Sequence, residues 1–273
     1  MTVYPNAKIN IGLNVVERRQ DGYHNIETIF YPINLQDELS VRQTDMQVAY
    51  RFVSTGIKIG ENPENNLIIK ALNLLKTHYP FPSVKISLAK HIPFGAGLGG
   101  GSSDAAFMLK SLNELFQLNI SLEDLEKLAS RLGADCPFFI QNKPVFASGI
   151  GNIFTPINLS LKGYWLLLVK PEIHVSTPIA YAGVTPTLPK NSLTKLIRQP
   201  IETWKDSITN DFEQSVYEKY PEIEKLKKKM YDKGATYASM SGSGSSVYGI
   251  FNTKPDEKEF RPTYSHVFSI ELC

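Results

Sequence analysis

A glycine-rich segment in the first half of the chain has the residue types that bind phosphate. It follows an expected strand at 84–89, leads into an expected helix at 104–116, and contains five glycines. Glycine lets backbone N–H groups approach an anion closely, and a helix N-terminus adds free donors and partial positive charge. Ser102 and Ser103 add hydroxyls suited to phosphate oxygens or a magnesium ion. The predicted phosphate loop consists of Pro93, Phe94, Gly95, Ala96, Gly97, Leu98, Gly99, Gly100, Gly101, Ser102 and Ser103.

Three alternative roles for this segment are weaker. Gly95, Gly97 and Gly100 satisfy the G-x-G-x-x-G pattern of dinucleotide-binding folds, but Glu114, at the spacing of its acidic partner, falls inside the helix rather than after a second strand. A Walker-type P-loop would carry a lysine directly before the serine, where Gly101 stands. A flexible hinge would not need a helix directly after it.

The elements that must position this loop mix strands and helices. Apolar residues alternate at 9–15 as in a strand, and the helix expected at 66–78 has one apolar stripe. A further helix begins at Ser121 with Asp124 in a capping-box arrangement and ends at Gly133. Other expected elements are strands at 28–30, 39–41, 165–169, 237–240 and 246–251, helices at 201–217 and 223–233, and a loop at 171–189. The mixture predicts an α+β fold with two domains, 1–155 and 156–273.

Charge and cysteine content exclude several classes of protein. Lys and Arg total 29 against 27 Asp and Glu, and a net charge of +2 is too small to favour nucleic acid or a membrane surface as partner. The two cysteines, Cys136 and Cys273, form no disulfide framework and no paired metal-ligand spacing. The chain starts without an apolar signal segment, and its longest apolar stretch, 164–169, is too short to span a membrane. A cytoplasmic protein is expected.

Several strings of residues resemble the motifs of the GHMP kinase superfamily, in the same order along the chain. They are AKINIGL at 7–13, the segment 93–106, and SGSG at 241–244. The strings DGYH at 21–24 and GADCPF at 133–138 narrow the resemblance to the branch that acts on cytidine-diphospho-methylerythritol in the non-mevalonate isoprenoid pathway. The likeness also takes in 65–68, 176–178 and 210–213, so it spans nearly the whole chain apart from its C-terminal end.

This resemblance implies a fold, a reaction and its cofactors. The expected N-terminal domain is like ribosomal protein S5 domain 2, the expected C-terminal domain is ferredoxin-like, and ATP and substrate meet between them. The implied reaction is ATP-dependent phosphorylation of the 2-hydroxyl group of cytidine-diphospho-methylerythritol, with ATP and Mg²⁺ as cofactors. No acidic residue aligns with the metal-binding glutamate of some superfamily members, so phosphates and water are expected to hold most of the magnesium shell.

The resemblance also assigns catalytic roles. Asp135 is the expected base that accepts the proton of the substrate hydroxyl, although position alone favours a surface carboxylate past a helix end. Lys8 beside Asp135 would keep the carboxylate ionised and stabilise a developing alkoxide. Asn10, on the same strand face as Lys8, would orient Lys8 or the substrate. Asn66 is expected near the adenine, with a helix N-cap as the alternative.

Four further residues are expected at the substrate. Tyr23 and His24 follow the turn signal Asp-Gly, so an exposed loop tip is the alternative to the cytosine pocket that the resemblance implies. Thr177 and Tyr181 belong to the same pocket, in which Tyr23 and Tyr181 would sandwich the base while His24 binds its polar edge.

Two rival functions remain open at the level of sequence. Another GHMP kinase, acting on a sugar, homoserine or a mevalonate-type substrate, would keep the glycine loop but lose the DGYH string. A non-catalytic RNA-binding module is the rival of another class, because the S5-like fold also occurs in the ribosome, but the low net charge speaks against it.

Overall fold

The computed structural model describes residues 1–59 and 63–272. These residues form two compact units, each made of segments that are discontinuous in the sequence. Unit 1 contains residues 1–7, 35–94 and 99–143, and unit 2 contains residues 8–34, 95–98 and 144–273. The domain boundary expected between residues 155 and 156 stays a prediction, because a single boundary in the sequence cannot be compared directly with units built from discontinuous segments.

Unit 1 contains a four-stranded sheet in the order β1 (Thr2–Val3), β4 (Glu38–Thr44), β6 (Ser83–Lys90) and β5 (Tyr50–Gly56). The β4 and β6 strands pair antiparallel, whereas β5 pairs parallel to β6. Burial alternates strictly along β6, so its apolar side chains share the inner face and the strand predicted at 84–89 is confirmed. The strand ends directly before the glycine-rich segment.

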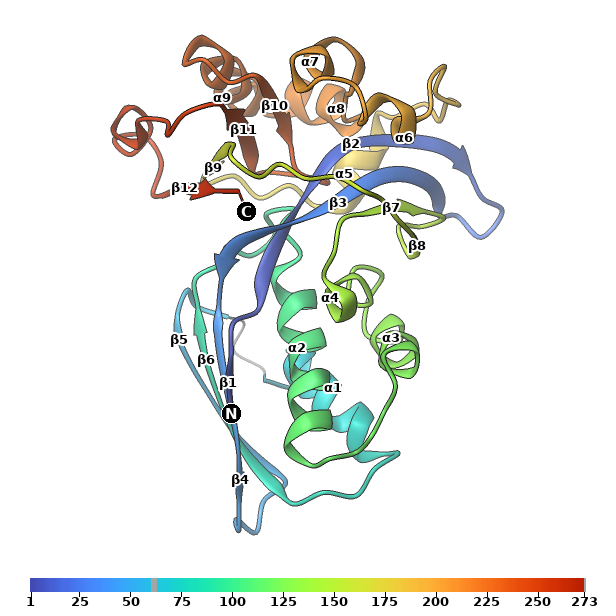
Figure 1. Ribbon diagram of the computed structural model, residues 1–273, viewed down its shortest axis with the longest axis vertical. Coiled ribbons are helices and arrows are strands. Elements are labelled where there is room, and N and C mark those ends of the chain that lie inside the picture. The colour runs from blue at the N-terminus through green and yellow to red at the C-terminus, as the bar shows by residue number, and fades with distance from the viewer. Residues whose placement is uncertain (60–62, 273) are drawn as a thin grey trace. The chain divides into compact units, whose positions relative to one another are not determined.

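The helices of unit 1 are α1 (Leu67–Lys76), α2 (Gly100–Leu115), α3 (Leu122–Ser130) and α4 (Phe138–Gln141), with a 3₁₀ turn η1 at Pro63–Asn65. Figure 1 shows α1 and α2 on one face of the sheet. The side-chain oxygen of Asn66 accepts a hydrogen bond from Ile68 N at 2.9 Å, so Asn66 is the N-cap of α1. Ser121 caps α3 in the same way, through Asp124 N at 3.1 Å, and both predicted helices are confirmed.

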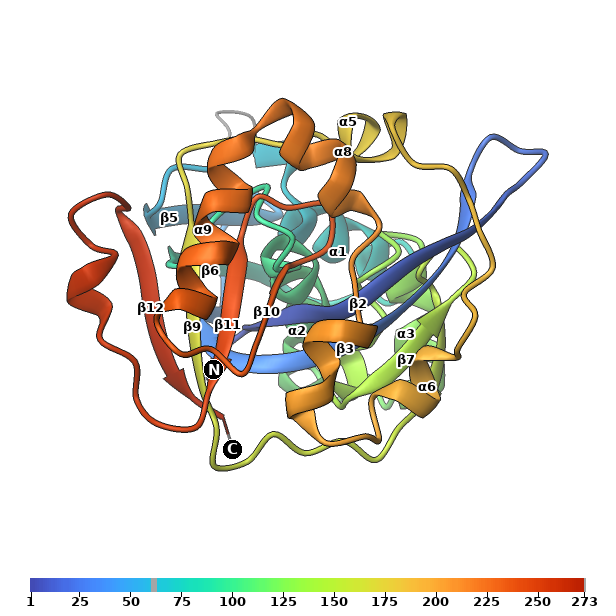
Figure 2. The same cartoon turned by 90° about the horizontal axis from the view of Figure 1, so that it is seen from above.

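Unit 2 contains two four-stranded sheets. The first has the order β2 (Asn6–Arg18), β3 (His24–Gln36), β7 (Val145–Ser148) and β8 (Ile153–Pro156). The second is antiparallel throughout, in the order β10 (Tyr237–Met240), β11 (Val247–Phe251), β9 (Trp165–Lys170) and β12 (His266–Glu271). Helix α9 (Pro221–Asp232) lies along β10 and β11 of the second sheet (Figure 2). Helix α8 (Phe212–Lys219) packs against α9.

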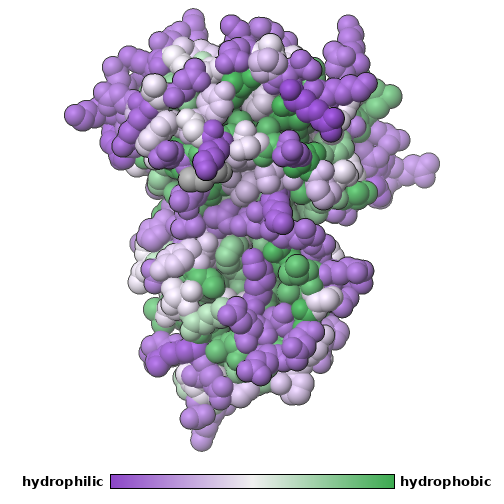
Figure 3. All heavy atoms as spheres, viewed as in Figure 1, coloured by the Kyte–Doolittle hydropathy of each residue, from purple (hydrophilic) through white to green (hydrophobic). Residues whose placement is uncertain are grey.

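One hydrophobic core of unit 2 joins early and late parts of the sequence. Leu13, Val15 and Ile26 pack in a cluster with residues of β9, α8, α9, β10 and β11. On the face drawn in Figure 3, hydrophilic residues predominate and hydrophobic ones are scattered among them. Within the described residues, no helix is both long and apolar enough to cross a membrane.

The α+β class is confirmed, but several elements differ from the sequence-based expectation. The helix expected from Asp104 begins at Gly100, because Gly99 takes a left-handed conformation and caps it. The loop expected at 171–189 contains a short helix, and the helix expected at 201–217 is interrupted at 208–211. Strands β1, β5, β7, β8 and β12 were not among the expected strands. The remaining short elements are α5 (Thr177–Ala182), α6 (Leu193–Leu196), η2 (Ile201–Thr203), α7 (Trp204–Ser207) and η3 (Glu257–Glu259).

Candidate active site

The N-terminus of α2 presents backbone donors at the glycine-rich segment. Gly99 is its N-cap with φ 68°, and the first turn contains no acidic residue. The first N–H groups of an α-helix have no partner inside the helix, and they carry partial positive charge. The observed order of strand, glycines and helix therefore matches the predicted phosphate loop, whose residues 99–103 lie in unit 1 and whose residues 95–98 lie in unit 2.

Two positions of this segment require glycine because neighbouring residues lie too close to leave room for a Cβ atom. A Cβ atom on Gly97, which has φ +74°, would lie 1.9 Å from the carbonyl oxygen of Ser241. A Cβ atom on Gly100 would lie 2.8 Å from a side-chain carbon of Ile92. Real Cβ atoms do not come so near to other atoms, so any larger residue would displace the loop or the segment packed against it.

Unit 1 contains a pocket of about 170 Å³ beside the glycines. Its lining brings together Asn66, Phe94 and Gly101, three residues predicted to bind the nucleotide. The full lining is Ile59, Asn65, Asn66, Leu67, Phe94, Gly101 and Asp104. Apolar walls with a few polar groups are typical of a site for a planar ligand such as a nucleobase. The Asn66 side-chain oxygen is already used as the cap of α1, so its capping role is present whether or not it also binds a base.

A buried ionic cluster lies at the same end of α2. The Lys90 ammonium contacts the carboxylates of Asp37 and Asp104, and these three side chains are at most 4% exposed. Asp37 also accepts hydrogen bonds from the backbone N–H groups of His91 and Ile92, at 2.6 and 2.9 Å. Burial, reinforced by the charge of Asp37, raises the pKa of Asp104 to about 7, although Lys90 opposes the shift. The cluster ties the end of β6 to the first turns of α2.

Asp135 lies half-buried in the turn between α3 and α4. Burial raises the pKa of the neighbouring Cys136 thiol to about 11, while a hydrogen bond with Ser102 opposes the shift and the charge of Asp135 adds to it. The structure thus brings the first turn of α2 to the segment that carries the predicted base. A thiol with so high a pKa is protonated at neutral pH, which makes Cys136 a packing residue rather than a nucleophile.

In unit 2, Lys8 and Asn10 lie on β2 against the other part of the glycine segment. The Lys8 side chain is 3% exposed, and its ammonium donates to Asn10 Oδ1 at 2.5 Å and to the Gly97 carbonyl at 3.3 Å. The side-chain amide of Asn10 donates to Thr28 Oγ1 at 3.0 Å. Asn10 thus contacts Lys8, and its expected role of orienting Lys8 or the substrate stays a prediction. Lys8 and Asp135 lie in different units, so their predicted pairing stays a prediction.

An aromatic group in unit 2 contains two of the residues predicted to bind the substrate base. The His24 ring stacks on Tyr181, with ring centroids 4.7 Å apart and an angle of 20° between the planes. Phe212 meets Tyr181 edge-on at 4.6 Å, and Tyr23 is 63% exposed. Because His24 covers one face of Tyr181, a base held by Tyr181 must use the other face or displace His24. Thr177 is the first residue of α5, on the same short helix as Tyr181.

Sequence reasoning missed His174, which lies against the phosphate loop. Its ring atoms are 2.8 and 2.9 Å from the position that a Cβ atom on Gly95 would occupy. The adjacent Ile173 carbonyl accepts a hydrogen bond from Ser245 Oγ at 2.5 Å. No spacing rule connects residues so far apart in sequence. Lys90 was missed for the same reason, since its partners Asp37 and Asp104 lie in separate parts of the sequence.

The described residues contain no group of three or more His, Cys, Asp or Glu side chains that could hold a metal ion. A magnesium ion brought in with a nucleotide would therefore rely on phosphate oxygens and water, with the Ser102 and Ser103 hydroxyls close to the helix end. The residues present are compatible with such a nucleotide-borne ion.

Comparison with known families defines the class of protein. Residues 66–143 match the GHMP kinases N terminal domain, and residues 192–268 match the GHMP kinases C terminal family. A mevalonate kinase of Methanococcus jannaschii has the same fold, with a TM-score of 0.70 at 14% identity over 100% of this chain and 98% of the other. These findings identify the two parts of a GHMP kinase.

Comparison with individual proteins narrows the class. The 4-diphosphocytidyl-2-C-methyl-D-erythritol kinase of Parabacteroides distasonis is 55% identical over 98% of this chain and 97% of its own length. The protein of the same name from Bacteroides fragilis is 53% identical over 99% and 98%. A crystal structure of 4-(cytidine 5'-diphospho)-2C-methyl-D-erythritol kinase superposes with a TM-score of 0.84 at 30% identity, covering 100% of this chain and 99% of that one. The chain belongs to the 4-diphosphocytidyl-2-C-methyl-D-erythritol kinase family of GHMP kinases, which confirms the resemblance seen in its motifs.

Proposed function

We propose that the protein transfers the γ-phosphoryl group of ATP to the 2-hydroxyl of 4-diphosphocytidyl-2-C-methyl-D-erythritol, in the cytoplasm and with Mg²⁺. The observation that carries the kinase part is the N-terminus of α2, where glycines free of side chains present backbone donors beside a pocket lined by Asn66 and Phe94. The substrate part is supported by relatives of that name that match 98–99% of the chain at 53–55% identity.

The phosphate loop binds the polyphosphate in this proposal. Phosphoryl transfer requires mainly that the reacting groups be positioned and that developing charge be stabilised. The N–H groups of the loop and of the α2 terminus serve as fixed dipoles, and Ser102 and Ser103 add hydroxyl donors. Asn66, Phe94 and Gly101 enclose the adenine. Magnesium supplies charge neutralisation on the phosphates when it is bound with the nucleotide.

The alcohol is activated by Asp135 and Lys8. Asp135 accepts the proton of the 2-hydroxyl as the oxygen attacks, and the Lys8 ammonium, oriented by Asn10, stabilises charge on that oxygen. The cytidine is held by Tyr23, His24, Thr177 and Tyr181. A stacked base gains ~1–3 kcal/mol from an aromatic contact. Hydrogen bonds of His24 distinguish cytosine from uracil, because an unmatched buried polar group is costly.

Turnover of a panel of alcohols tests the proposed function. The purified protein is incubated with Mg-ATP and with 4-diphosphocytidyl-2-C-methyl-D-erythritol, its uridine analogue, homoserine or mevalonate, and ADP and phosphorylated product are measured. We expect phosphorylation of the cytidine substrate with a clear preference over the other three. Failure to phosphorylate it, or equal use of homoserine or mevalonate, would contradict the substrate assignment.

Asp135→Asn tests the assigned base. The substitution removes the proton acceptor with almost no change of shape, so kcat should fall roughly 100-fold or more, the usual scale for a positioned base. Binding of a non-hydrolysable ATP analogue, measured by calorimetry, should be unchanged. Asp232→Asn, at the exposed end of α9, is the control and should retain full activity. Near-normal turnover of Asp135→Asn would remove Asp135 from the mechanism.

A further inference from the structure

Asn210 and Glu213 are polar side chains buried in the core of unit 2, at the start of α8. Asn210 is 3% exposed and Glu213 is 7% exposed. The roles proposed for the reaction use neither residue. Buried polar groups are stable only when their hydrogen bonds are satisfied, so their partners indicate what they hold in place.

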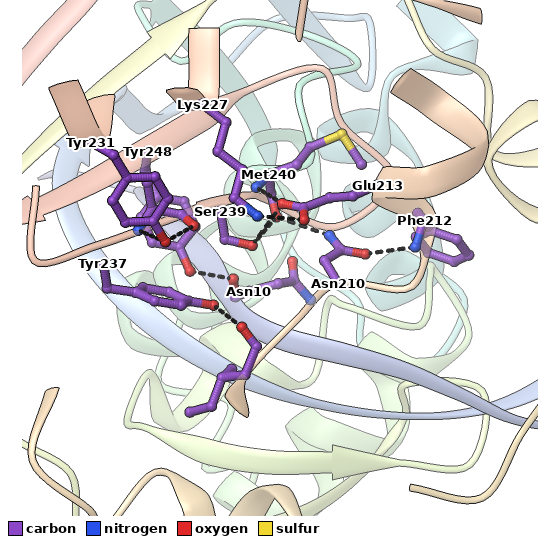
Figure 4. A network of polar contacts seen from close by, with 12 residues as sticks. Asn10, Asn210, Phe212, Glu213, Lys227, Tyr231, Tyr237, Ser239, Met240 and Tyr248 are labelled. Carbon is purple, nitrogen blue, oxygen red and sulfur yellow. Dashed lines mark hydrogen bonds and ion pairs between the residues drawn. The ribbon is translucent and has the colours of Figure 1, made fainter. Parts of the chain in front are cut away.

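The Asn210 side chain binds the backbone on either side of Ser241, at the start of a glycine-rich turn. Its amide nitrogen donates to the carbonyl of Met240 at 2.9 Å, and its oxygen accepts from Phe212 N at 3.0 Å (Figure 4). The same nitrogen donates to the carbonyl of Gly242 at 2.8 Å. Both N–H donors of the amide and one of its two oxygen lone pairs are thus used, each by a backbone group. The amide therefore fixes the backbone as it leaves β10 and enters the glycine-rich turn 241–244.

The backbone around Asn210 is tied to β2. Leu13 N donates to the Thr209 carbonyl at 2.9 Å, and Asp211 N donates to the Leu13 carbonyl at 2.8 Å. The pair Leu13 and Asn210 forms an isolated parallel bridge. Asn210 thus connects the turn to the strand that carries Lys8 and Asn10. The same bridge explains why the helix expected at 201–217 is interrupted at this point.

Glu213 holds the residues just before the turn. Its Oε1 accepts hydrogen bonds from Met240 N at 2.9 Å and from Ser239 Oγ at 3.2 Å, and its Oε2 forms an ion pair with Lys227 Nζ at 2.6 Å (Figure 4). Asn210 and Glu213 together bind both the N–H and the carbonyl of Met240. A residue whose backbone N–H and carbonyl are both bound by buried side chains has little freedom to shift.

The turn 241–244 also contacts the phosphate loop. Ser241 Oγ donates to the Gly97 carbonyl at 2.9 Å and accepts from Asn10 N at 3.1 Å. The same Gly97 carbonyl accepts from the Lys8 ammonium at 3.3 Å. A Cβ atom on Gly242 would lie 3.1 Å from Asn10 Oδ1, so the turn packs directly on the pair Lys8 and Asn10.

We propose that Asn210 and Glu213 are positioning residues for the reaction: they fix the turn 241–244, which sets the placement of Gly97 in the phosphate loop and of the Lys8 ammonium. The proposal rests on the proposed function for the roles of Gly97 and Lys8. It predicts that disturbing this network lowers nucleotide affinity and kcat although neither residue touches a ligand.

Asn210→Asp is the sharpest test. The variant keeps the shape and the oxygen that accepts from Phe212 N, but it replaces the amide donor by an oxygen that faces two carbonyl oxygens. The turn must move to relieve this repulsion. We expect the affinity for Mg-AMPPNP, measured by calorimetry well below the melting temperature, to fall roughly 10-fold or more, and kcat to fall as well. Unchanged affinity and unchanged kcat would overturn the proposal.

Tyr231→Phe is the matched control for general loss of stability. The Tyr231 hydroxyl donates to the Ala238 carbonyl and accepts from Ala238 N, each at 3.1 Å. Ala238 lies in β10, the strand that leads into the turn, but outside the turn itself. Its loss should lower the melting temperature while leaving AMPPNP affinity within about threefold. If Tyr231→Phe reduced affinity as much as Asn210→Asp, the network would be merely structural and the proposal would fail.

A second pair of variants covers the case in which Asn210→Asp does not fold. Glu213→Gln keeps the oxygen that accepts from Met240 N and loses the ion pair with Lys227, whose side chain is 22% exposed and can turn to solvent. Glu213→Ala removes both interactions. We expect the glutamine variant to bind AMPPNP within about threefold of the parent and the alanine variant to bind roughly 10-fold or more weakly. Equal affinities for the two variants would contradict the proposal. Nucleotide binding is measured without the alcohol, so an error in the assigned substrate would leave these results interpretable.

Discussion

Single polar residues in the interior of both units connect segments that lie far apart in the sequence. Lys90 joins Asp37 and Asp104 in unit 1, and Asn210 joins β2 to the turn after β10 in unit 2. A buried ion or amide without partners would cost several kcal/mol, so each of these residues restricts the neighbouring backbone to one arrangement. In unit 1 the restricted backbone adjoins the predicted phosphate loop, and in unit 2 it contacts the loop through Ser241.

The Asp104 carboxyl makes stability depend on pH. Its pKa of about 7 in the folded state lies above the ordinary value of 3.8, so the folded protein binds this proton more tightly than the unfolded chain. Its contribution to stability is full below pH ~4 and is lost as pH rises through ~7. Asp104→Asn lacks this titration. We expect the free energy of unfolding of the variant, measured with urea, to rise relative to the parent by roughly 1–4 kcal/mol between pH 4.5 and pH 8.

The difference in unfolding free energy between Asp104→Asn and the parent reports on Asp104 alone, because the other groups that titrate in this range are present in both proteins. Asparagine keeps an oxygen for Lys90, and Lys90 keeps its contact with Asp37. A difference in unfolding free energy that stays constant from pH 4.5 to pH 8 would show that Asp104 does not titrate there.

Residue types and local spacing predicted part of the site but not its contacts. The glycine loop, Lys8, Asn10 and Asn66 were recognisable because each belongs to a short string or a helix end. His174, Lys90 and Glu213 were not, because their partners are 50 or more residues away or belong to other elements. The resemblance implied that Tyr23 and Tyr181 sandwich the base; the structure shows His24 stacked on Tyr181, and the sandwich stays a prediction.

Helix α2 and the strand β6 before it were predictable from the spacing of their apolar residues. The strand β6 alternates buried and exposed residues as its sequence predicts, and α2 places an apolar stripe on the sheet. Strand β5 could not be predicted in this way, because five of its seven residues are exposed and show no apolar alternation. Helix α5 was hidden in a Pro- and Thr-rich stretch, where Pro178 in its first turn supports a helix start rather than breaking it.

Gly97→Ala tests the close contact between the phosphate loop and the turn 241–244. The new Cβ would meet the Ser241 carbonyl, so the loop must move and AMPPNP affinity should fall roughly 10-fold or more. Gly234→Ala is the control, because Gly234 also has a left-handed backbone, with φ +90°, but nothing lies within 4 Å of its Cβ position. Both variants should lose ~1–2 kcal/mol of stability from backbone strain. A normal affinity for Gly97→Ala would exclude the contact from nucleotide binding.

At the scale of the whole molecule, membership in a GHMP kinase family was predictable because its motifs are spread over nearly the full sequence. The α+β class was predictable from the mixture of expected strands and helices. The division into compact units was not. Unit 2 takes residues 8–34 and 95–98 from within the stretch that otherwise forms unit 1. Periodicity identifies strands and helices, but it does not determine which core each of them joins.

Nucleotide should stabilise the entire protein if it binds only the folded state. At 100 times its dissociation constant a ligand contributes ~2.7 kcal/mol, which corresponds to a rise in melting temperature of roughly 5–10 °C for a chain of this size. We expect this rise with Mg-AMPPNP and a smaller one when EDTA removes the magnesium. A rise that EDTA does not reduce would argue against a magnesium-dependent site.

The shared core of unit 2 has a consequence for how the chain folds as it is synthesised. Leu13, Val15 and Ile26 leave the ribosome early, but the core that buries them includes α8, α9 and β11, which are made much later. The segments of unit 1 are complete at residue 143, so that unit has all its parts while the first strands of unit 2 still wait for theirs. Unpaired apolar strands are prone to misassociate during such a delay. Because the core of unit 2 joins Leu13, Val15 and Ile26 to residues after 165, these early strands remain without their packing partners until the later segments have been made.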